Sequence, residues 1–316
     1  GRKRGRIWRL IPSKARLRPV VEWQGASNAV LLAALADDNA WRRFTAQRLL
    51  IDRGGRAAVD GLTEMVRHDR SAVGRLHALY TLEGLGALRP QEIAVALNDA
   101  HSGVQLHALQ LSERVLPDNA ETVARLMRLA ESAESRVRLQ VVLTLGESKN
   151  AAADSSLLEF ARRFGHERWM SAAILSGSRD RAGRLLAGLL AGLTLEKGER
   201  ELIGPLAATL GGRRRATEWI PVLEEVVSHD VAVKTVCLEG LVSGLAGNEV
   251  KLNGVEPIWP ALSRLVADRS PPIRHLAIRL ASRLGFGGRP EIRREMQLAM
   301  VRAQDLGVAI PDRAAA

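Results

Sequence analysis

The stretch DNAWRRFTAQRLL (38–50) decides the fold, because six later stretches repeat its pattern from one apolar anchor residue. The seven aligned anchors are Trp41, Val73, Val104, Val137, Trp169, Val233 and Ile273. Successive anchors lie 32, 31, 33, 32, 64 and 40 residues apart, and 64 is two periods. A period of this length is typical of stacked helix pairs. We therefore predict an all-α, right-handed α-solenoid of about eight helix pairs.

Each anchored stretch has the pattern of an amphipathic helix. The position five residues after the anchor is always apolar; it is filled by Ala46, Ala78, Leu109, Val142, Ile174, Leu238 and Ile278. The position directly after the anchor is basic in four of the seven stretches; it is filled by Arg42, Gly74, Gln105, Arg138, Met170, Lys234 and Arg274. One face of each helix is therefore apolar and the next face is polar.

A preceding helix is expected in front of each anchored one, and a short polar turn between the two. Clear examples of the first helix are the stretches 29–35, 58–66, 121–130 and 257–267. The expected turns are 37–39, 68–71, 99–102, 228–230 and 268–272. Asp, Asn and Ser in these turns can cap the second helix by accepting hydrogen bonds from its free N–H groups.

Glycine is expected to end the units, because it adopts the left-handed geometry that stops a helix at little steric cost. The expected ends are Gly54–Gly55, Gly86, Gly146, Gly211–Gly212 and Gly285. One anchor is missing near residue 201, where Ile203 or Leu206 is expected to take the packing role. The 40-residue gap contains surplus residues near 247–257, where we expect a loop.

The composition limits the kind of core and the kind of chemistry. With 46% hydrophobic but only 3% aromatic residues, the core must be built from Leu, Ala, Val and Ile. Four tryptophans are nevertheless expected to be core residues, namely Trp41, Trp169, Trp219 and Trp259. The single cysteine, Cys237, excludes a disulfide within the chain and is interpreted as an inert buried thiol. The longest apolar run (185–195) is too short to span a membrane.

The positive charge is concentrated at one end. The formal net charge is +11, and residues 1–23 carry eight Arg and Lys against one Glu, which leaves the rest of the chain nearly balanced. Within residues 1–24, an extended basic segment, GRIWRLIP (5–12) has the alternation of a strand. Trp8 and Trp23 flank the basic connector and are expected to be the most exposed tryptophans. The run Arg213–Arg214–Arg215 is interpreted as a solvated loop in preference to a phosphate clamp.

The pattern resembles HEAT repeats over residues 25–303, with 304–316 left as a tail. In that family an Asp in the turn is followed six residues later by an Arg in the second helix. Asp268 with Arg274 and Asp69 with Arg75 fit, whereas Gln105 follows Asp99 and Ser132 precedes Arg138. The resemblance implies an α-solenoid and says little about function, since such repeats serve unrelated tasks.

A larger resemblance rests on GRIWRL (5–10), DNAWRRFTAQRLL (38–50) and the repeats after them. It is to putative membrane-bound dehydrogenases of planctomycetes and verrucomicrobia, in which a β-propeller, a HEAT region and a c-type cytochrome domain follow one another. The chain lacks the CxxCH haem motif of that family and does not begin with Met, so we interpret it as a fragment that holds the linking solenoid. The resemblance implies a periplasmic location; the residues alone give none.

No catalytic or metal-binding motif is found, so we expect a non-enzymatic scaffold without a cofactor. Its partner would be another protein or a neighbouring domain of the same polypeptide. The candidate interaction residues are Arg42, Arg138, Lys234, Arg274, Trp8 and Trp23. The alternative for the four cations is a structural role, in Asp–Arg hydrogen bonds between neighbouring turns. The alternative function is nucleic-acid binding, as in the HEAT-like alkylpurine DNA glycosylases.

Overall fold

The computed structural model describes residues 10, 13–14, 20–192, 197–245 and 254–304. These fall into two compact units, Gly1–Leu88 and Arg89–Ala316, and each is described by itself. Every regular element in the described residues is a helix. The expected strand at 5–12, Trp8 and most of the expected loop at 247–257 lie outside the described residues.

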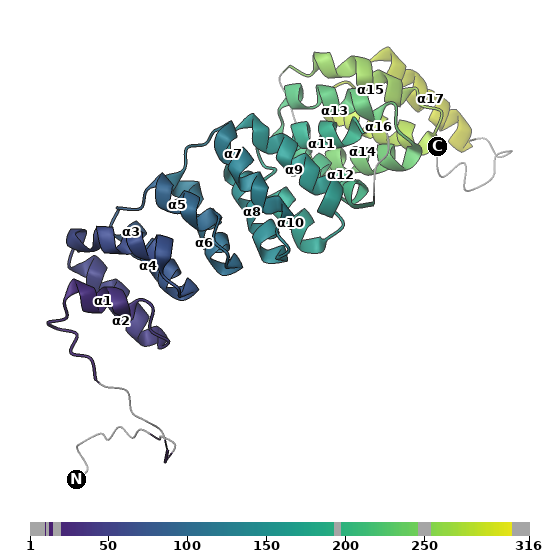
Figure 1. The fold of residues 1–316 in the computed structure, drawn as a ribbon. Coiled ribbons are helices and arrows are strands. Elements are labelled where there is room, and N and C mark those ends of the chain that lie inside the picture. Colours follow the sequence, from purple (N-terminus) through teal and green to yellow (C-terminus); the bar gives the residue numbers. More distant parts are fainter. Residues whose placement is uncertain (1–9, 11–12, 15–19, 193–196, 246–253, 305–316) are drawn as a thin grey trace, which may run out of the picture. The chain divides into compact units, whose positions relative to one another are not determined.

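The first unit contains two helix pairs (Figure 1). Helix α1 (Asn28–Ala34) packs on α2 (Ala40–Asp52), and α3 (Val59–His68) packs on α4 (Ala72–Gly84). The 3₁₀ turn η1 (Arg56–Ala58) leads into α3. The two second helices, α2 and α4, also contact each other, so the pairs stack.

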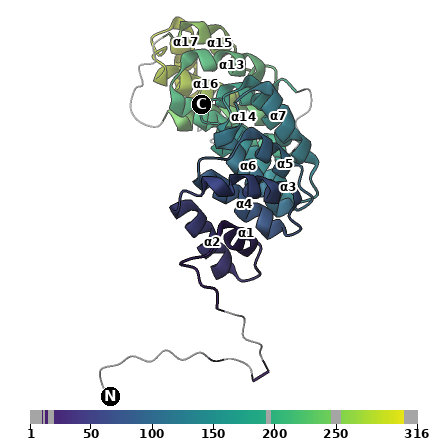
Figure 2. The ribbon, with the colours of Figure 1, turned by 60° about the vertical axis from the view of Figure 1, so that its left-hand side comes forward.

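The second unit contains six further pairs and one final helix in its described residues. The first helices form one layer: α5 (Pro90–Leu97), α7 (Ala120–Met127), α9 (Ala151–Phe164), α11 (Ala182–Leu190), α13 (Ile220–Val226), α15 (Trp259–Val266) and α17 (Pro290–Gln304). The second helices form the other: α6 (Ser102–Val115), α8 (Ser135–Glu147), α10 (Arg168–Ser176), α12 (Lys197–Arg213), α14 (Val231–Gly244) and α16 (Pro271–Arg283). Three short 3₁₀ turns are η2 (Arg128–Glu131), η3 (Ala216–Glu218) and η4 (Glu256–Ile258). In Figure 2, α13, α15 and α17 lie beside one another in the first layer. The expected all-α, solenoid-like fold of stacked pairs is confirmed.

Turn residues cap the second helices as the sequence predicts. Asn39 Oδ1 accepts from the Trp41 N–H at 2.9 Å, and Asp230 Oδ1 accepts from the Val233 N–H at 2.8 Å. Ser71 caps α4 in the same way. One cap was not predicted: Nδ1 of His101 accepts from the N–H of Gly103 at 3.1 Å. Each such cap is worth about 0.5–2 kcal/mol of stability.

The caps also correct the register of the repeat. In α6, α8, α14 and α16 the anchor lies three residues after the cap and is buried; these anchors are Val104, Val137, Val233 and Ile273. Trp41, Val73 and Trp169 lie only two residues after their caps, and their side chains are exposed. The structural equivalents one residue later are Arg42, Gly74 and Met170. The prediction that Trp41 and Trp169 are core residues was therefore wrong, because their helices turn them to solvent.

Two uses of glycine separate in the structure. Gly54, Gly86 and Gly285 have φ between 61° and 89° at the ends of second helices, as predicted. Gly146 and Gly211 instead lie inside α8 and α12 and do not end them. A methyl group on Gly211 would lie 2.6 Å from the Leu241 carbonyl oxygen of α14, so this glycine allows two helices to pack closely.

The core is built from Leu, Ala, Val and Ile, as the composition requires. In the degenerate unit, both Ile203 and Leu206 are buried, so both candidates for the packing role fill it. Trp219 is fully buried and Trp259 nearly so, which confirms the prediction for these two tryptophans. Cys237 is also buried, and burial raises the pKa of its thiol to about 12, so the thiolate is suppressed at neutral pH.

Candidate interaction surface

Two of the four predicted cations donate hydrogen bonds to the turn that precedes their own helix. Arg138 donates from Nη1 to the carbonyl oxygens of Ser132 at 2.7 Å and Ala133 at 3.1 Å. Arg274 makes the same contact with Asp268, at 2.9 Å. In both, the acceptor lies six residues before the donor, so the bond closes the turn that joins the two helices of a pair.

The same contact recurs at Arg75 and Gln105, whose six-residue spacing the sequence analysis noted, and at Arg43, which it left out. Arg43 and Arg75 each donate to the carbonyl oxygen of the Asp six residues earlier, at 2.7 Å, and the Gln105 amide does so at 2.8 Å. The signal for Arg43 was present in the sequence, since Asp37 precedes it by six residues. The one-residue register error at Trp41 directed attention to Arg42 instead.

The other two predicted cations form ion pairs. Arg42 Nη1 lies 3.2 Å from Asp37 Oδ2 in its own turn. Lys234 Nζ lies 2.8 Å from Asp268 Oδ2, and this pair joins neighbouring repeats. Burial raises the pKa of Asp268, but the hydrogen bonds from Lys234 and from the Ser270 N–H outweigh it and hold that pKa below its usual value. Each of the four cations thus has an intramolecular partner.

Aromatic side chains are exposed on the first unit. Trp41 and Phe44, on one face of α2, are 63% and 62% exposed. The half-buried Trp23 meets Trp41 edge to face, with ring centroids 5.9 Å apart. Trp23 is held there because Arg53, at the end of α2, donates to its carbonyl oxygen at 2.9 Å and to those of Gln24 and Ala26. The expectation that Trp23 is more exposed than Trp41 was therefore wrong.

On α10 of the second unit, Trp169 takes the same position relative to its cap as Trp41 and is 68% exposed. The guanidinium of Arg168 lies 5.2 Å from the centre of a Trp169 ring. Exposed tryptophan beside arginine is the composition of many protein-binding surfaces, where these two residue types dominate the binding energy. Leu143 on the neighbouring α8 is also exposed.

A buried histidine lies directly behind the aromatic pair of α2. His77 on α4 receives a hydrogen bond from Arg43 Nε at 3.2 Å, and its Nδ1 lies 2.7 Å from Gln47 Oε1. The Phe44 ring meets the imidazole edge to face at 5.2 Å. Burial, and then the positive charge of Arg43, lower the pKa of His77, so the imidazole is neutral at physiological pH.

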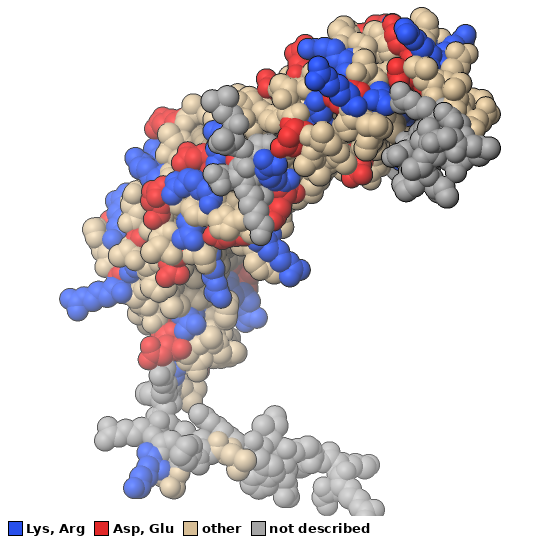
Figure 3. All heavy atoms as spheres, turned by 90° about the vertical axis from the view of Figure 1, so that its right-hand side faces the viewer, with Lys and Arg blue, Asp and Glu red and all other residues tan. Residues whose placement is uncertain are grey.

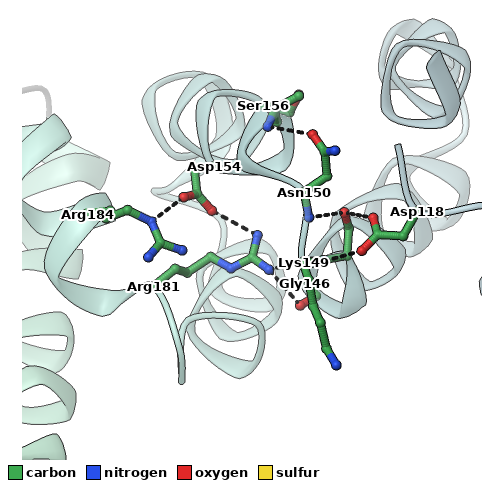
Figure 4. Close-up of polar contacts among 10 residues, drawn as sticks. Asp118, Gly146, Lys149, Asn150, Asp154, Ser156, Arg181 and Arg184 are labelled. Carbon is green, nitrogen blue, oxygen red and sulfur yellow. Dashed lines mark hydrogen bonds and ion pairs between the residues drawn. The ribbon is translucent and has the colours of Figure 1, made fainter. Parts of the chain in front are cut away.

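In the second unit, a ladder of polar contacts links successive turns between repeats (Figure 4). Asp118 accepts from the Ser148 hydroxyl at 2.5 Å and from the Lys149 N–H at 2.7 Å. The hydrogen bond from Ser148 is the largest cause of the lowered pKa of Asp118. Arg181 donates in turn to the carbonyl oxygens of Gly146, at 3.3 Å, and Ser148.

Arg181 is the most buried cation of this ladder, at 5% exposure. Its charge is balanced by Asp154, whose Oδ1 lies 3.1 Å from Arg181 Nη1. Asp154 also accepts from the exposed Arg184 at 2.5 Å, and Figure 4 shows the carboxylate between the two guanidinium groups. No local sequence signal marks this cluster, because its members are brought together only by the stacking of repeats.

A cavity of about 90 Å³ lies at the C-terminal ends of α6 and α8, over apolar Leu116, Val123 and Leu126. This is far below the roughly 300 Å³ at which ligand pockets usually begin. In the described ranges, no three His, Cys, Asp or Glu side chains are grouped to hold a metal ion. None of the helices examined there is both long and apolar enough to cross a membrane.

Charge is mixed on one face of the molecule. In the face drawn in Figure 3, Lys and Arg alternate with Asp and Glu and do not form one continuous basic track. The comparisons with known proteins add no assignment: neither a protein-family model nor a curated protein matches the chain. The arguments for function therefore rest on the fold and on these surfaces.

Proposed function

We propose that the chain is a non-enzymatic protein-interaction scaffold that binds through the exposed faces of its second helices. The exposure of Trp41 and Trp169 at one repeat position carries the proposal. An exposed tryptophan costs solubility and adds little to the packing of its own repeat. At an interface, truncation of such a residue can cost about 2 kcal/mol or more of binding energy, the range of a hot spot.

In this proposal the predicted cations stabilise the binding surface and do not contact the partner. Arg138 and Arg274 donate hydrogen bonds to turn carbonyls, and Lys234 forms an ion pair with Asp268. This favours the structural alternative for these residues. In this proposal the binding contacts are made by Trp41 and Trp169, which the sequence analysis expected in the core.

The partner, within this proposal, is another protein or a neighbouring domain of one polypeptide. The resemblance to propeller–HEAT–cytochrome proteins supports the second choice, with the solenoid setting the spacing between two redox domains in the periplasm. The full-length reading frame tests this context directly: a propeller before the repeats and a CxxCH domain after them are the expected result. Their absence would remove the redox context and leave the scaffold proposal standing.

Site-specific photo-cross-linking in the native cells tests the scaffold itself. A benzophenone amino acid placed at Phe44 or at Trp169 should give discrete protein adducts of defined mass. The same group at Gln91, an exposed residue of the first helix α5, is the control and should give none. Equal labelling from all three positions, or adducts with nucleic acid only, would contradict the proposal.

The nucleic-acid alternative makes a separate prediction. Its affinity must fall steeply with salt, because phosphate contacts release counterions. The basic residues 1–23 would contribute to any such binding. Tight binding of duplex DNA at physiological salt by a variant in which the Arg and Lys of residues 1–23 are replaced by Gln would favour this alternative over the scaffold.

A further inference from the structure

One arginine occupies a backbone position that three other repeats give to glycine. Helices α2, α4 and α16 are each followed, within two residues of their ends, by a glycine with positive φ. After α12, the residue in this conformation is Arg214, with φ of 55°. A β-carbon is strained there, and only glycine takes the position freely. A strained residue that persists points to a role outside packing.

The neighbouring Arg213 organises the turn around Arg214. It donates from Nε and Nη2 to the two carboxylate oxygens of Glu218, at 2.8 and 2.9 Å. Its Nη1 reaches the previous turn, where it bonds the Arg179 carbonyl and Asp180 Oδ1, the latter at 2.6 Å. The Arg213 side chain is only 11% exposed, and all three of its guanidinium nitrogens donate hydrogen bonds. Its contacts hold the turn at 178–181 beside the turn at 213–218.

These two turns carry more positive charge than they neutralise. The turns at 178–181 and 213–218 contain five arginines and two carboxylates, and one of the five, Arg181, pairs with Asp154. Arg213 engages both carboxylates, and Arg215, which is 67% exposed, shares Glu218 at 3.5 Å. The side chains of Arg179 and Arg214 are exposed, and no ion pair is found for either within the described parts of the chain. An anionic group that docks here would meet two exposed guanidinium groups that form no ion pair in the described residues.

We propose that Arg179, Arg214 and Arg215 form a docking edge for an acidic segment of a protein partner. The inference rests on the proposed scaffold function and names the chemistry of one partner contact. The guanidinium fork matches a carboxylate in a two-point contact. The edge lies on the turns that follow the C-terminal ends of α10 and α12 in the second unit.

The same edge is poorly suited to a nucleic acid. Asp180 and Glu218 alternate with the arginines, so a continuous phosphate backbone would meet carboxylates as well as cations. The one aromatic residue next to the turn, Trp219, is fully buried and offers no face on which a base could stack. A short acidic peptide can place its carboxylates between these groups.

Binding of fluorescein-labelled poly-glutamate to the full chain tests the proposal by anisotropy at physiological salt. Arg214→Gly should weaken binding about three- to fivefold, the value of one exposed ion pair, and Arg179→Gln should do the same. Arg214→Gly should also raise the melting temperature, because it relieves the backbone strain. Arg279→Gln, on the exposed face of α16, is the matched control and should change neither property. In the parent and in every variant the Arg and Lys of residues 1–23 are replaced by Gln, so that this segment does not bind the probe.

Parent-like binding of poly-glutamate by both Arg214→Gly and Arg179→Gln would overturn the docking edge. So would a larger loss of duplex-DNA binding than of poly-glutamate binding, because it would assign the edge to nucleic acid. Arg214→Asn, which tolerates the left-handed region, repeats the measurement should the glycine variant misfold. Protein adducts from Phe44 and Trp169 would still support the scaffold in these cases, so the two proposals fail separately.

Discussion

Arg43 on α2 donates a hydrogen bond from Nε to Nε2 of His77 on α4 at 3.2 Å, so the imidazole that joins these helices must be neutral. Its Nδ1–H then donates to Gln47 Oε1 at 2.7 Å. A second proton on His77 would place a donor against a donor, beside the charge of Arg43. The packing of one second helix on the next therefore depends on the protonation of one residue.

The contact between Arg43 and His77 predicts that the free energy of unfolding decreases as the pH falls. The pKa of His77 is lowered in the folded protein, so the unfolded chain binds the proton more tightly. The contribution of neutral His77 is complete above the ordinary pKa of about 6.5 and is lost as the pH falls from there towards the folded pKa, by at most about 1.4 kcal/mol per pH unit. Urea unfolding of the parent and of His77→Gln across this range measures it. Parallel pH profiles for the two proteins would contradict the assignment.

The turn contacts predict that Arg138 stabilises the fold without binding a partner. Arg138→Ala removes two hydrogen bonds to turn carbonyls and a contact with the Phe164 ring at 5.3 Å. A loss of about 1.5–3 kcal/mol is expected, the range for a hydrogen bond from a charged donor. Arg136→Ala, two residues earlier on the same helix, removes an exposed cation and should cost less than about 0.5 kcal/mol. Equal losses for the two variants would show that the turn contact contributes nothing.

Asp154 lies between the buried Arg181 and the exposed Arg184. Variants of these two arginines form a matched pair that separates the effect of burial. Arg181→Ala leaves Asp154 without its buried partner and frees the carbonyls of Gly146 and Ser148, so a loss of about 3–5 kcal/mol is expected. Arg184→Ala removes the partner that is 62% exposed and should cost no more than about 1 kcal/mol. Thermal unfolding followed by circular dichroism compares them. A larger loss for Arg184→Ala would mean that burial does not set the strength of this cluster.

The sequence could predict the helices because a period near 32 residues and turn caps such as Asp230 are local signals. It placed Trp41 wrongly because a large apolar side chain at the start of an amphipathic helix resembles a core residue. Counting three residues from the cap Asn39 would have corrected it. The contacts of Arg181 and the backbone conformation of Arg214 had no local signal. They arise from the stacking of turns about 30 residues apart and from one φ angle.

The close packing of α12 on α14 predicts opposite results for two glycines. A methyl group on Gly240 would lie 2.5 Å from the Gly204 carbonyl oxygen and 2.7 Å from Ala207 Cβ, so Gly240→Ala must separate two tightly packed helices. Overpacking of this kind costs about 1–3 kcal/mol or more. A methyl group on Gly212 meets only the Gly244 carbonyl oxygen, at 3.7 Å, an ordinary contact.

Gly212→Ala should therefore stabilise α12 by up to about 1 kcal/mol, because alanine favours a helix over glycine by that amount. Both changes add the same methyl group, to α14 and α12 respectively, so intrinsic helix propensity favours each of them. The difference in their unfolding free energies isolates the contact between the helices. If Gly240→Ala were as stable as Gly212→Ala, the two backbones could not approach as closely as the structure shows.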